Sequence, residues 1–231
     1  APPCRPIRVM IVDDSAVVRG LVTRWVEATD GFEVVGTAVN GRAALDAARL
    51  LRPEILLLDL DMPELDGLTA LPLLLAAHPG LSVLVVSTLT QRNAEISLDC
   101  LRRGAVDYLP KPGGPREITL VTSFREELVA KLQGLAPRHR RDGTGPRQPA
   151  GRPGGTGRPR ALLVGASTGG PAALLALLRE MKRVADAVPI LVVQHLPAIF
   201  TAVFARQLQE ETGIPSAEGA EAEPIRAGRL Y

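Results

Sequence analysis

The sequence predicts two successive α/β domains, each built around a parallel β-sheet. Short aliphatic runs alternate with amphipathic segments between residues 7 and 135, and the same alternation begins again at residue 161. Near-continuous aliphatic runs are typical of strands buried on both faces, as in a parallel sheet covered by helices. A length of 231 residues also fits two domains better than one.

The first domain is expected to contain five strands with helices between them. The strands are predicted at Ile7–Val12, Phe32–Ala38, Ile55–Leu58, Ser82–Val86 and Asp107–Leu109. The clearest helical pattern follows the first strand, where one face carries Val17, Val18, Leu21, Val22, Trp25 and Val26. The last helix is predicted over Glu117–Leu135. Residues 1–135 should therefore form a five-stranded, doubly wound sheet.

The composition changes after residue 135. Residues 136–160 are rich in Pro, Gly and Arg and lack large apolar side chains, so we expect a flexible linker. Its arginines could contact an acidic partner, although a solvated spacer is the simpler interpretation. Buried strands are predicted again at Ala161–Val164 and Ile190–Val193, with a helix over Pro171–Lys182 between them. Residues 161–231 are thus interpreted as the N-terminal part of a second parallel, Rossmann-like α/β domain.

The composition argues against several classes of protein. A formal net charge of +2 gives no indication of nucleic-acid binding. The two cysteines, Cys4 and Cys100, fit a reducing compartment better than a disulfide scaffold. No apolar run approaches the ~20 residues needed to cross a bilayer, so membrane insertion is not expected. These features predict a soluble, cytoplasmic protein.

Polar side chains follow successive strands of the first domain. Asp13 and Asp14 come just after the first strand and Asp59 directly after the third. In an open parallel sheet, ligands bind at the carboxyl ends of the strands, so these carboxylates should converge. Their mutual repulsion calls for a cation, and hard oxygen ligands suit Mg²⁺. Ser87 and Lys111 follow the fourth and fifth strands and would complete a site for a phosphoryl group.

These motifs resemble the receiver domain of bacterial response regulators. The resemblance rests on Val12-Asp13-Asp14-Ser15, Asp59-Leu60-Asp61-Met62-Pro63-Glu64-Leu65-Asp66-Gly67, Ser87-Thr88 and Lys111-Pro112. It implies that Asp59 accepts phosphate from a histidine kinase. Asp13, Asp14 and the backbone carbonyl of Asp61 would hold Mg²⁺, and Lys111 would pair with the phosphoryl oxygens. Ser87 would swing towards the phosphate and Tyr108 would repack, although the Tyr108 ring could equally be ordinary core.

The second domain opens with the turn Gly165-Ala166-Ser167-Thr168-Gly169-Gly170, between a predicted strand and a predicted helix. A serine flanked by glycines at a strand-to-helix turn has the form of a nucleophile elbow. Backbone N–H groups at the helix start point to the same place and could hold an oxyanion. Taken alone, the turn could equally bind phosphate or simply end a strand.

A histidine follows the next strand, in Gln194-His195-Leu196-Pro197. If the two strands are neighbours, the His195 imidazole can approach the Ser167 hydroxyl. A receiver, a linker, Gly-Ala-Ser-Thr-Gly-Gly-Pro and Gln-His-Leu-Pro together resemble the chemotaxis protein-glutamate methylesterases, the CheB family. The resemblance implies a serine esterase that hydrolyses glutamate methyl esters on chemoreceptors and often deamidates receptor glutamines.

Carried over by motif, Ser167 is the nucleophile and His195 the general base. Thr168 and the amides of the turn would support the oxyanion, and the esterase site would need no cofactor. The aspartate of the family's triad lies downstream of anything present, and Asp186, expected in a helix-to-strand loop, matches no family motif. The sequence is therefore interpreted as a fragment that should be nearly inactive, since loss of the equivalent aspartate in a serine protease costs about 10⁴-fold in turnover.

Along the chain, a switch domain is followed by a linker and then an enzyme domain. This order suggests that the switch regulates the enzyme. The receiver would lie over the Ser167 rim and exclude receptor helices until phosphorylation of Asp59 loosens the contact. Two other interpretations stay open. A receiver followed by a non-catalytic α/β remnant would bind partners without chemistry. A nucleotide-binding loop is disfavoured because the turn lacks the Gly-Lys-Ser/Thr ending of a P-loop.

Overall fold

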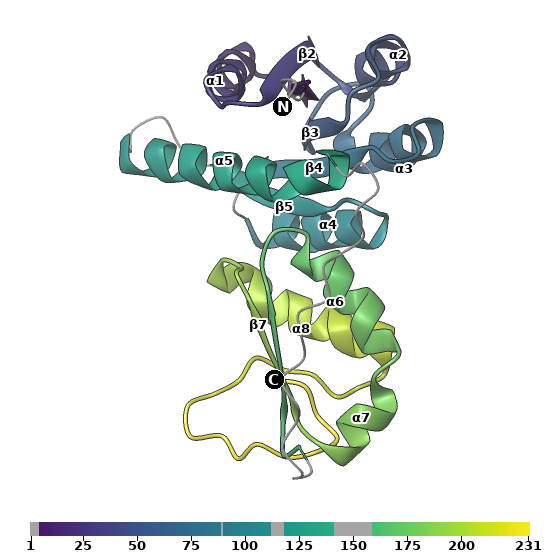
Figure 1. Cartoon of the computed structure of the whole chain (residues 1–231), viewed down its shortest axis with the longest axis vertical. Helices are drawn as coiled ribbons and strands as arrows, with labels where there is room; N and C mark the ends of the chain where they lie inside the picture. The colour runs from purple at the N-terminus through teal and green to yellow at the C-terminus, as the bar shows by residue number, and fades with distance from the viewer. Residues whose placement is uncertain (1–4, 89, 112–117, 141–158) are drawn as a thin grey trace.

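The computed structural model describes residues 5–88, 90–111, 118–140 and 159–231, and two sheets organise them (Figure 1). The first sheet has the strand order β2-β1-β3-β4-β5, and every pair in it is parallel. Its strands are β1 Ile7–Val12, β2 Phe32–Ala38, β3 Ile55–Asp59, β4 Ser82–Thr88 and β5 Asp107–Lys111. The second sheet pairs β6 Leu162–Ala166 with β7 Ile190–Gln194, also in parallel. The predicted fold class is confirmed.

Helices cover both faces of the first sheet. They are α1 Ala16–Glu27, α2 Gly41–Leu51, α3 Gly67–Ala77, α4 Gln91–Arg102 and α5 Ile118–Arg140. Apolar side chains of α1 and α5 pack with Ile7, Val9 and Ile11 on one face, while α2, α3 and α4 pack with Met10 and Val12 on the other. The alternation of strand side chains between two helical layers produces a doubly wound fold.

The α1 and α5 helices differ in detail from their predictions. Val17 is 79% exposed, because the buried face of α1 is the narrower stripe centred on Val22 and Val26. Helix α5 continues to Arg140, so the predicted linker begins too early. Leu135 and Ala136 are buried with the other α5 side chains, and this extends the apolar stripe into the segment predicted as linker. Residues 141–158 of that segment, and Pro112, lie outside the described residues.

The second domain packs its helices on one face of its sheet. They are α6 Gly170–Arg179, α7 Lys182–Ala187 and α8 Ala198–Thr212. The single helix predicted over Pro171–Lys182 is therefore wrong at its end, because the chain turns at Glu180 and α7 begins anew. Leu163 and Val193 on the opposite face are 72% and 71% exposed. The segment around Leu230 pairs in parallel with β7 at Ile190 through an isolated bridge.

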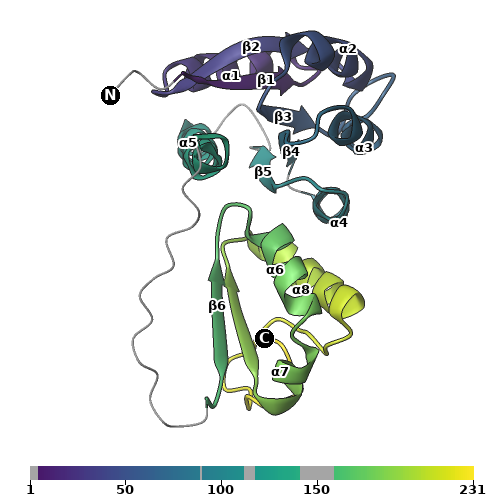
Figure 2. The ribbon, with the colours of Figure 1, turned by 45° about the vertical axis from the view of Figure 1, so that its right-hand side comes forward.

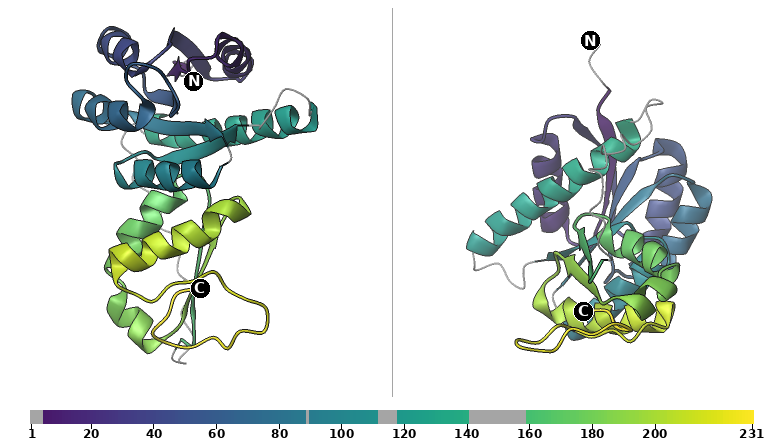
Figure 3. Two further views of the ribbon diagram at one scale, coloured as in Figure 1. Left: turned by 180° about the vertical axis from the view of Figure 1, so that it is seen from behind. Right: turned by 60° about the horizontal axis from the view of Figure 1, so that its bottom comes forward.

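The two domains lie against each other mainly through α4 and β5 of the first and α6 and α8 of the second (Figures 2 and 3). The ring of Tyr108 on β5 stacks on Phe200 of α8, with centroids 4.2 Å apart and ring planes 12° from parallel. Gln207 of α8 donates from Nε2 to the carbonyl of Leu98 in α4. One apolar cluster runs from the first domain into the second. No helix among the described residues is both long and apolar enough to span a bilayer.

Gly170, at the start of α6, tests how tightly the turn after β6 is packed. A Cβ there would lie 2.1 Å from Oε1 of Gln194 and 2.8 Å from Cβ of Ala166. Gly170→Ala should lower the free energy of unfolding by about 1–3 kcal/mol. Gly165→Ala is the matched control, because no atom lies within 4 Å of its added Cβ. Urea unfolding measures both, and equal stabilities would contradict the packing described.

Candidate phosphorylation and esterase sites

Two buried carboxylates meet at the carboxyl edge of the first sheet. Asp13 follows β1 and Asp59 ends β3, and each is 3% exposed. Nζ of Lys111, at the end of β5, lies 2.6 Å from Oδ2 of Asp13 and 2.8 Å from Oδ2 of Asp59. The convergence predicted from the sequence is confirmed. Backbone N–H groups of Ser15 and Leu60 donate to the other oxygen of each carboxylate.

Burial and neighbouring charge act in opposite directions on this cluster. Burial raises the pKa of Asp59 from 3.8 to about 6, although the Lys111 ammonium partly offsets it. Asp13 raises the same pKa further by repulsion. Burial alone would lower the pKa of Lys111, but the attraction of Asp59 and Asp13 outweighs it, so this pKa is raised. The ammonium therefore remains charged between two acids.

The same edge offers oxygen ligands for a divalent cation. One carboxylate oxygen from each of Asp13, Asp14 and Asp59 lies within 4.8 Å of the others. Opposing ligands of octahedral Mg²⁺ stand about 4 Å apart, so small side-chain movements would bring these oxygens around the ion. Asp14 is exposed, whereas Asp13 and Asp59 are buried. The carboxylates and their spacing fit Mg²⁺.

The two predicted switch residues are both buried. Ser87 is 3% exposed, and its hydroxyl donates to the carbonyl of Thr88 over 3.5 Å. Tyr108 is 2% exposed and faces the second domain, where it stacks on Phe200. Burial raises the pKa of the Tyr108 hydroxyl. Its ring is thus part of the contact between the domains, and its role as a switch stays a prediction.

The predicted elbow lies at the end of β6. Ser167 is exposed on a turn in which the N–H of Gly170 donates to its carbonyl over 2.7 Å. Gly169 has φ = 72°, a left-handed conformation that glycine adopts without strain. Strands β6 and β7 are neighbours in register, with Ala166 opposite Gln194. Ser167 and His195, one residue further along each strand, therefore share one rim.

Two hydrogen bonds join the carboxyl ends of β6 and β7, and the residues that follow them, at this rim. Gln194 donates from Nε2 to the carbonyl of Ser167 over 3.2 Å, and the N–H of His195 points to the carbonyl of Ala166. Among the described residues, no hydrogen bond joins the Ser167 hydroxyl to the His195 ring, and no carboxylate contacts that ring. The structure thus brings the two residues to one edge without closing a catalytic hydrogen bond.

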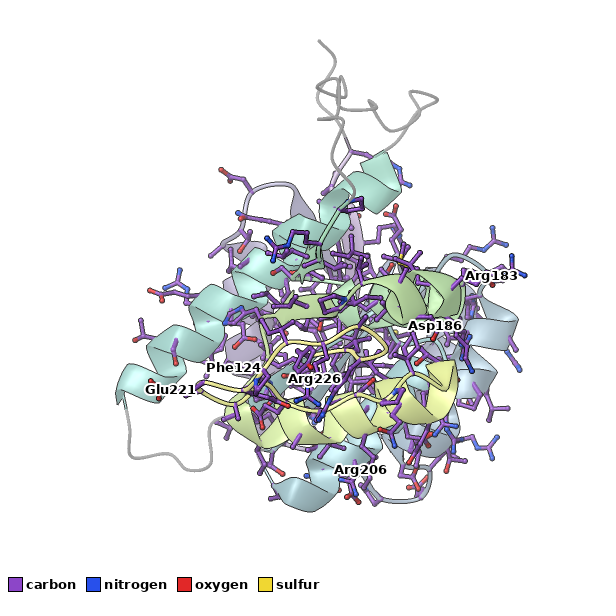
Figure 4. All side chains as sticks on the ribbon, turned by 90° about the horizontal axis from the view of Figure 1, so that it is seen from below. Phe124, Arg183, Asp186, Arg206, Glu221 and Arg226 are labelled. Carbon is purple, nitrogen blue, oxygen red and sulfur yellow. The ribbon has the colours of Figure 1, made fainter. Side chains whose placement is uncertain are left out.

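Asp186 does not lie in the loop that the sequence predicted. It is part of α7, together with Arg183 (Figure 4). The six-residue helix forms because Ala185 is buried while its neighbours stay in solvent, an amphipathic pattern too short to recognise in the sequence. Asp186 therefore offers no support for a catalytic role.

Sequence reasoning missed Asp107, a carboxylate at the junction of the two domains. It is 1% exposed, at the start of β5. Its Oδ2 accepts a hydrogen bond from the N–H of Gly169 over 3.0 Å and lies 3.1 Å from Nζ of Lys131. Gly134 of α5 faces Thr168, so closely that an added Cβ would lie 3.1 Å from that side chain. The available signal was an acid at the start of a strand, directly before Tyr108 and Leu109.

Asn93 was also missed. It lies in the first turn of α4 and is 6% exposed. Its Nδ2 donates to Oδ2 of Asp61 over 3.2 Å and to Oγ1 of Thr88 over 2.7 Å. The sequence gives no signal for this contact, because Asp61 and Thr88 lie 32 and 5 positions away from Asn93 and approach it only in the folded chain.

Comparison with known proteins agrees with both halves of the structure. Residues 9–122 match the family model of the response regulator receiver domain, and residues 162–231 match that of the CheB methylesterase. A protein-glutamate methylesterase/protein-glutamine glutaminase of Nitrobacter hamburgensis is 42% identical, over 98% of this chain and 64% of the relative. One from Nitrobacter winogradskyi is 36% identical, over 98% of this chain and 67% of the relative. The chain belongs to the CheB family.

The receiver half also resembles a solved CheB structure. The response regulator domain of Thermotoga maritima CheB is 36% identical, with a TM-score of 0.51, and covers 56% of this chain and 96% of that one. The chain spans about two thirds of the length of its CheB relatives. The family resemblance predicted from the motifs is thereby confirmed, while the roles of the individual site residues stay predictions.

The raised pKa of Asp59 predicts how stability depends on pH. The folded state binds this proton more tightly than the unfolded state, whose pKa is 3.8. As pH rises from about 4 to about 6, the free energy of unfolding should therefore fall, because the buried Asp59 carboxyl ionises at higher pH than it does in the unfolded chain. Asp59→Asn cannot ionise. Without Mg²⁺, its stability should exceed that of the wild type at neutral pH by more than at about pH 4.

Urea unfolding of both proteins at the two pH values measures this difference. Titrating groups outside the cluster of Asp13, Asp59 and Lys111 are the same in both proteins, so their contributions largely cancel. A gap between the two stabilities that does not widen with pH would contradict the burial described for Asp59.

Proposed function

We propose that this protein is a phosphorylation-activated protein-glutamate methylesterase of a chemotaxis system. The supporting observation is that Ser167 and His195 occupy adjoining ends of paired parallel strands, beside a receiver that contacts the same turn. The relatives from Nitrobacter are named protein-glutamate methylesterase/protein-glutamine glutaminase. The substrates would be methyl-esterified glutamates of chemoreceptors, with deamidation of receptor glutamines as a related reaction. No finding favours the non-catalytic alternative.

In the proposed reaction, the Ser167 oxygen attacks the ester carbonyl while His195 takes the hydroxyl proton. Backbone amides of the turn, supported by Thr168, stabilise the oxyanion. The carbon–oxygen bond to the methoxy group then breaks, and His195 returns the proton so that methanol leaves. A water molecule, deprotonated by His195, attacks the glutamyl-serine ester. Its cleavage frees the receptor carboxylate and restores the Ser167 hydroxyl.

The exposure of Ser167 suits a macromolecular substrate. A hydroxyl at the end of a strand, on an open rim, can reach a side chain on the surface of a receptor helix. A glutamate ester carries its carbonyl at the end of a flexible side chain, so only that end needs to enter the rim. A tight pocket around the whole substrate is not required for this chemistry.

Asp59 is the proposed acceptor of the phosphoryl group from a histidine kinase. Its carboxylate attacks phosphorus, and the bond to the kinase histidine breaks. Bound Mg²⁺, held by Asp13, Asp14, Asp59 and the carbonyl of Asp61, would neutralise phosphoryl charge. Lys111 already lies 2.8 Å from Asp59 and would pair with the phosphoryl oxygens. Ser87 would turn its hydroxyl from the Thr88 carbonyl to the phosphoryl group.

The contact between the domains supports regulation by exclusion. Asp107 binds the N–H of Gly169, and α5 packs beside Thr168, so the receiver borders the elbow. Ser167 itself is exposed. The receiver would therefore hinder the approach of a receptor helix rather than cover the hydroxyl. Movement of Ser87 and Tyr108 after phosphorylation would disturb the stack on Phe200 and loosen this contact.

The partners follow from this chemistry. A chemotaxis histidine kinase would supply the phosphoryl group, and methylated chemoreceptors would be the substrates. Receptor signalling helices and the kinase meet in the cytoplasm, where we place the protein. The proposal requires neither nucleic acid nor membrane insertion, and the esterase reaction uses no cofactor.

Methanol release from methylated receptor fragments tests the proposed activity. No carboxylate contacts His195 in the described part of the chain, so residues 1–231 should act about 10⁴-fold more slowly than the N. hamburgensis relative. Ser167→Ala should abolish the residual activity. Ser216→Ala, in the same domain, is the matched control and should not change it. Residual methanol release that persists in Ser167→Ala would contradict Ser167 as the nucleophile.

Asp107→Asn tests the proposed regulation. It removes the charge that holds Gly169 and leaves the Lys131 ammonium poorly compensated, so the receiver should separate from the elbow. We expect methanol release from receptor fragments to rise about threefold or more without phosphorylation. Glu127→Gln is the matched control, because Glu127 forms an ion pair with the same Lys131 within α5.

A small fluorophosphonate separates access from chemistry in these variants. Since Ser167 is already exposed, its labelling rate should rise less than methanol release in Asp107→Asn, although the variant also frees the N–H of Gly169. A rate of methanol release that Asp107→Asn leaves unchanged would contradict exclusion by the receiver.

A further inference from the structure

Gln194 belongs to the motif Gln194-His195-Leu196-Pro197, in which only His195 has a role in the proposed reaction. It ends β7 and lies opposite Ala166, the last residue of β6. Its Nε2 donates to the carbonyl of Ser167 over 3.2 Å and, more weakly, to that of His195 over 3.5 Å. An amide nitrogen carries two hydrogens, so both bonds form together. One side chain thus ties the turn of the proposed nucleophile to the strand that carries the proposed base.

The orientation of the Gln194 amide is set by its neighbours. Both groups beside Nε2 are carbonyl oxygens, so the reverse orientation would bring three acceptors together. Oε1 is buried and has no hydrogen-bond partner among the described residues. It faces the start of α6, where a Cβ added to Gly170 would lie 2.1 Å from it. An unpaired buried oxygen is unfavourable, so the two bonds of Nε2 are the polar interactions that hold the amide in this place.

The bond to Ser167 fixes the peptide unit that follows this residue. The Ser167 carbonyl accepts from two donors, Nε2 of Gln194 and the N–H of Gly170. The described chain has no cis peptide bond, so the N–H of Thr168 points away from that carbonyl. Among the residues that the structure describes, none accepts a hydrogen bond from this N–H. Its direction is therefore fixed while its hydrogen stays available to a ligand.

We propose that Gln194 is a positioning residue that orients the N–H of Thr168 as a donor to the oxyanion formed at Ser167. The inference rests on the proposed function, in which Ser167 is the nucleophile. In a nucleophile elbow, the N–H of the residue after the serine is one of the oxyanion donors. A donor that is already oriented stabilises the developing charge without rearrangement during the reaction. The Gln194 amide supplies this order from outside the turn.

Two phosphonyl fluorides that differ in one atom test the proposal on residues 1–231. In both, the Ser167 oxygen displaces fluoride from phosphorus, and the hydroxyl proton passes to solvent. The P=O probe places an oxygen where negative charge develops, whereas the P=S probe places a sulfur, which is a weak hydrogen-bond acceptor. An oriented Thr168 N–H therefore accelerates the reaction of the P=O probe selectively. The measured quantity is the ratio of the two labelling rates at Ser167.

Gln194→Met keeps the length of the side chain but cannot donate a hydrogen bond. Its reaction with the P=O probe should be about tenfold slower, the effect of one to two hydrogen bonds, and its reaction with the P=S probe should change less. The ratio of the rates should therefore fall. Gln194→Glu keeps the shape of the side chain, and its carboxylate repels the carbonyl oxygens, so the ratio should fall at least as far.

Gln209→Met is the matched control. Gln209 lies in the last turn of α8, and its side chain also bonds to the backbone, by accepting from the N–H of Ser216. The same substitution there removes one such bond in the same domain without touching the turn of Ser167. It should leave both labelling rates and their ratio unchanged.

The outcomes separate this inference from the proposal on which it rests. A purely structural role for Gln194 would slow both probes equally. An unchanged ratio in Gln194→Met and Gln194→Glu would therefore overturn the role of Gln194 alone, provided that wild-type Ser167 is labelled. A wild type in which Ser167 stays unmodified would overturn the proposed nucleophile and this inference with it.

Discussion

Strands that run parallel end at the same edge of their sheet, and every proposed reactive side chain of this protein depends on that constraint. Asp13, Asp59 and Lys111 come from three strands far apart in sequence, yet lie within hydrogen-bond distance. Ser167 and His195 are brought to one rim by the pairing of β6 with β7. A shift of one residue in either pairing would turn these side chains to the opposite face.

The contact between the domains concentrates polar and aromatic interactions at β5. Asp107 opens that strand and binds the elbow, Tyr108 follows it and stacks on the second domain, and Lys111 ends it beside Asp59. A rearrangement around Lys111 is therefore only three residues from the ring that packs on Phe200. Helix α4 offers a second route, since Asn93 on it binds Asp61 and Thr88 and the carbonyl of Leu98 on it accepts from Gln207. The closeness of these residues gives a physical path from phosphorylation to the elbow.

Sequence alone predicted the seven strands to within two residues at either end, because buried parallel strands are uniformly aliphatic. It also placed Asp13, Asp59 and Lys111 at one edge, since their positions follow from strand ends alone. The predicted end of the last helix was wrong, because Leu135 and Ala136 are buried in the core and α5 continues past them. The contacts of Asp107 and Asn93 could not be predicted, as each joins elements whose approach depends on the whole fold.

Asp59 and Ser167 are the two proposed reactive side chains, one on each rim, and peptide mapping by mass spectrometry tests this assignment most directly. The protein would be treated in one sample with acetyl phosphate and Mg²⁺, and in another with a fluorophosphonate. We predict a phosphoryl adduct on Asp59 in the first sample and a phosphonyl adduct on Ser167 in the second. An adduct on another residue in either sample, with Asp59 or Ser167 unmodified, would contradict the account.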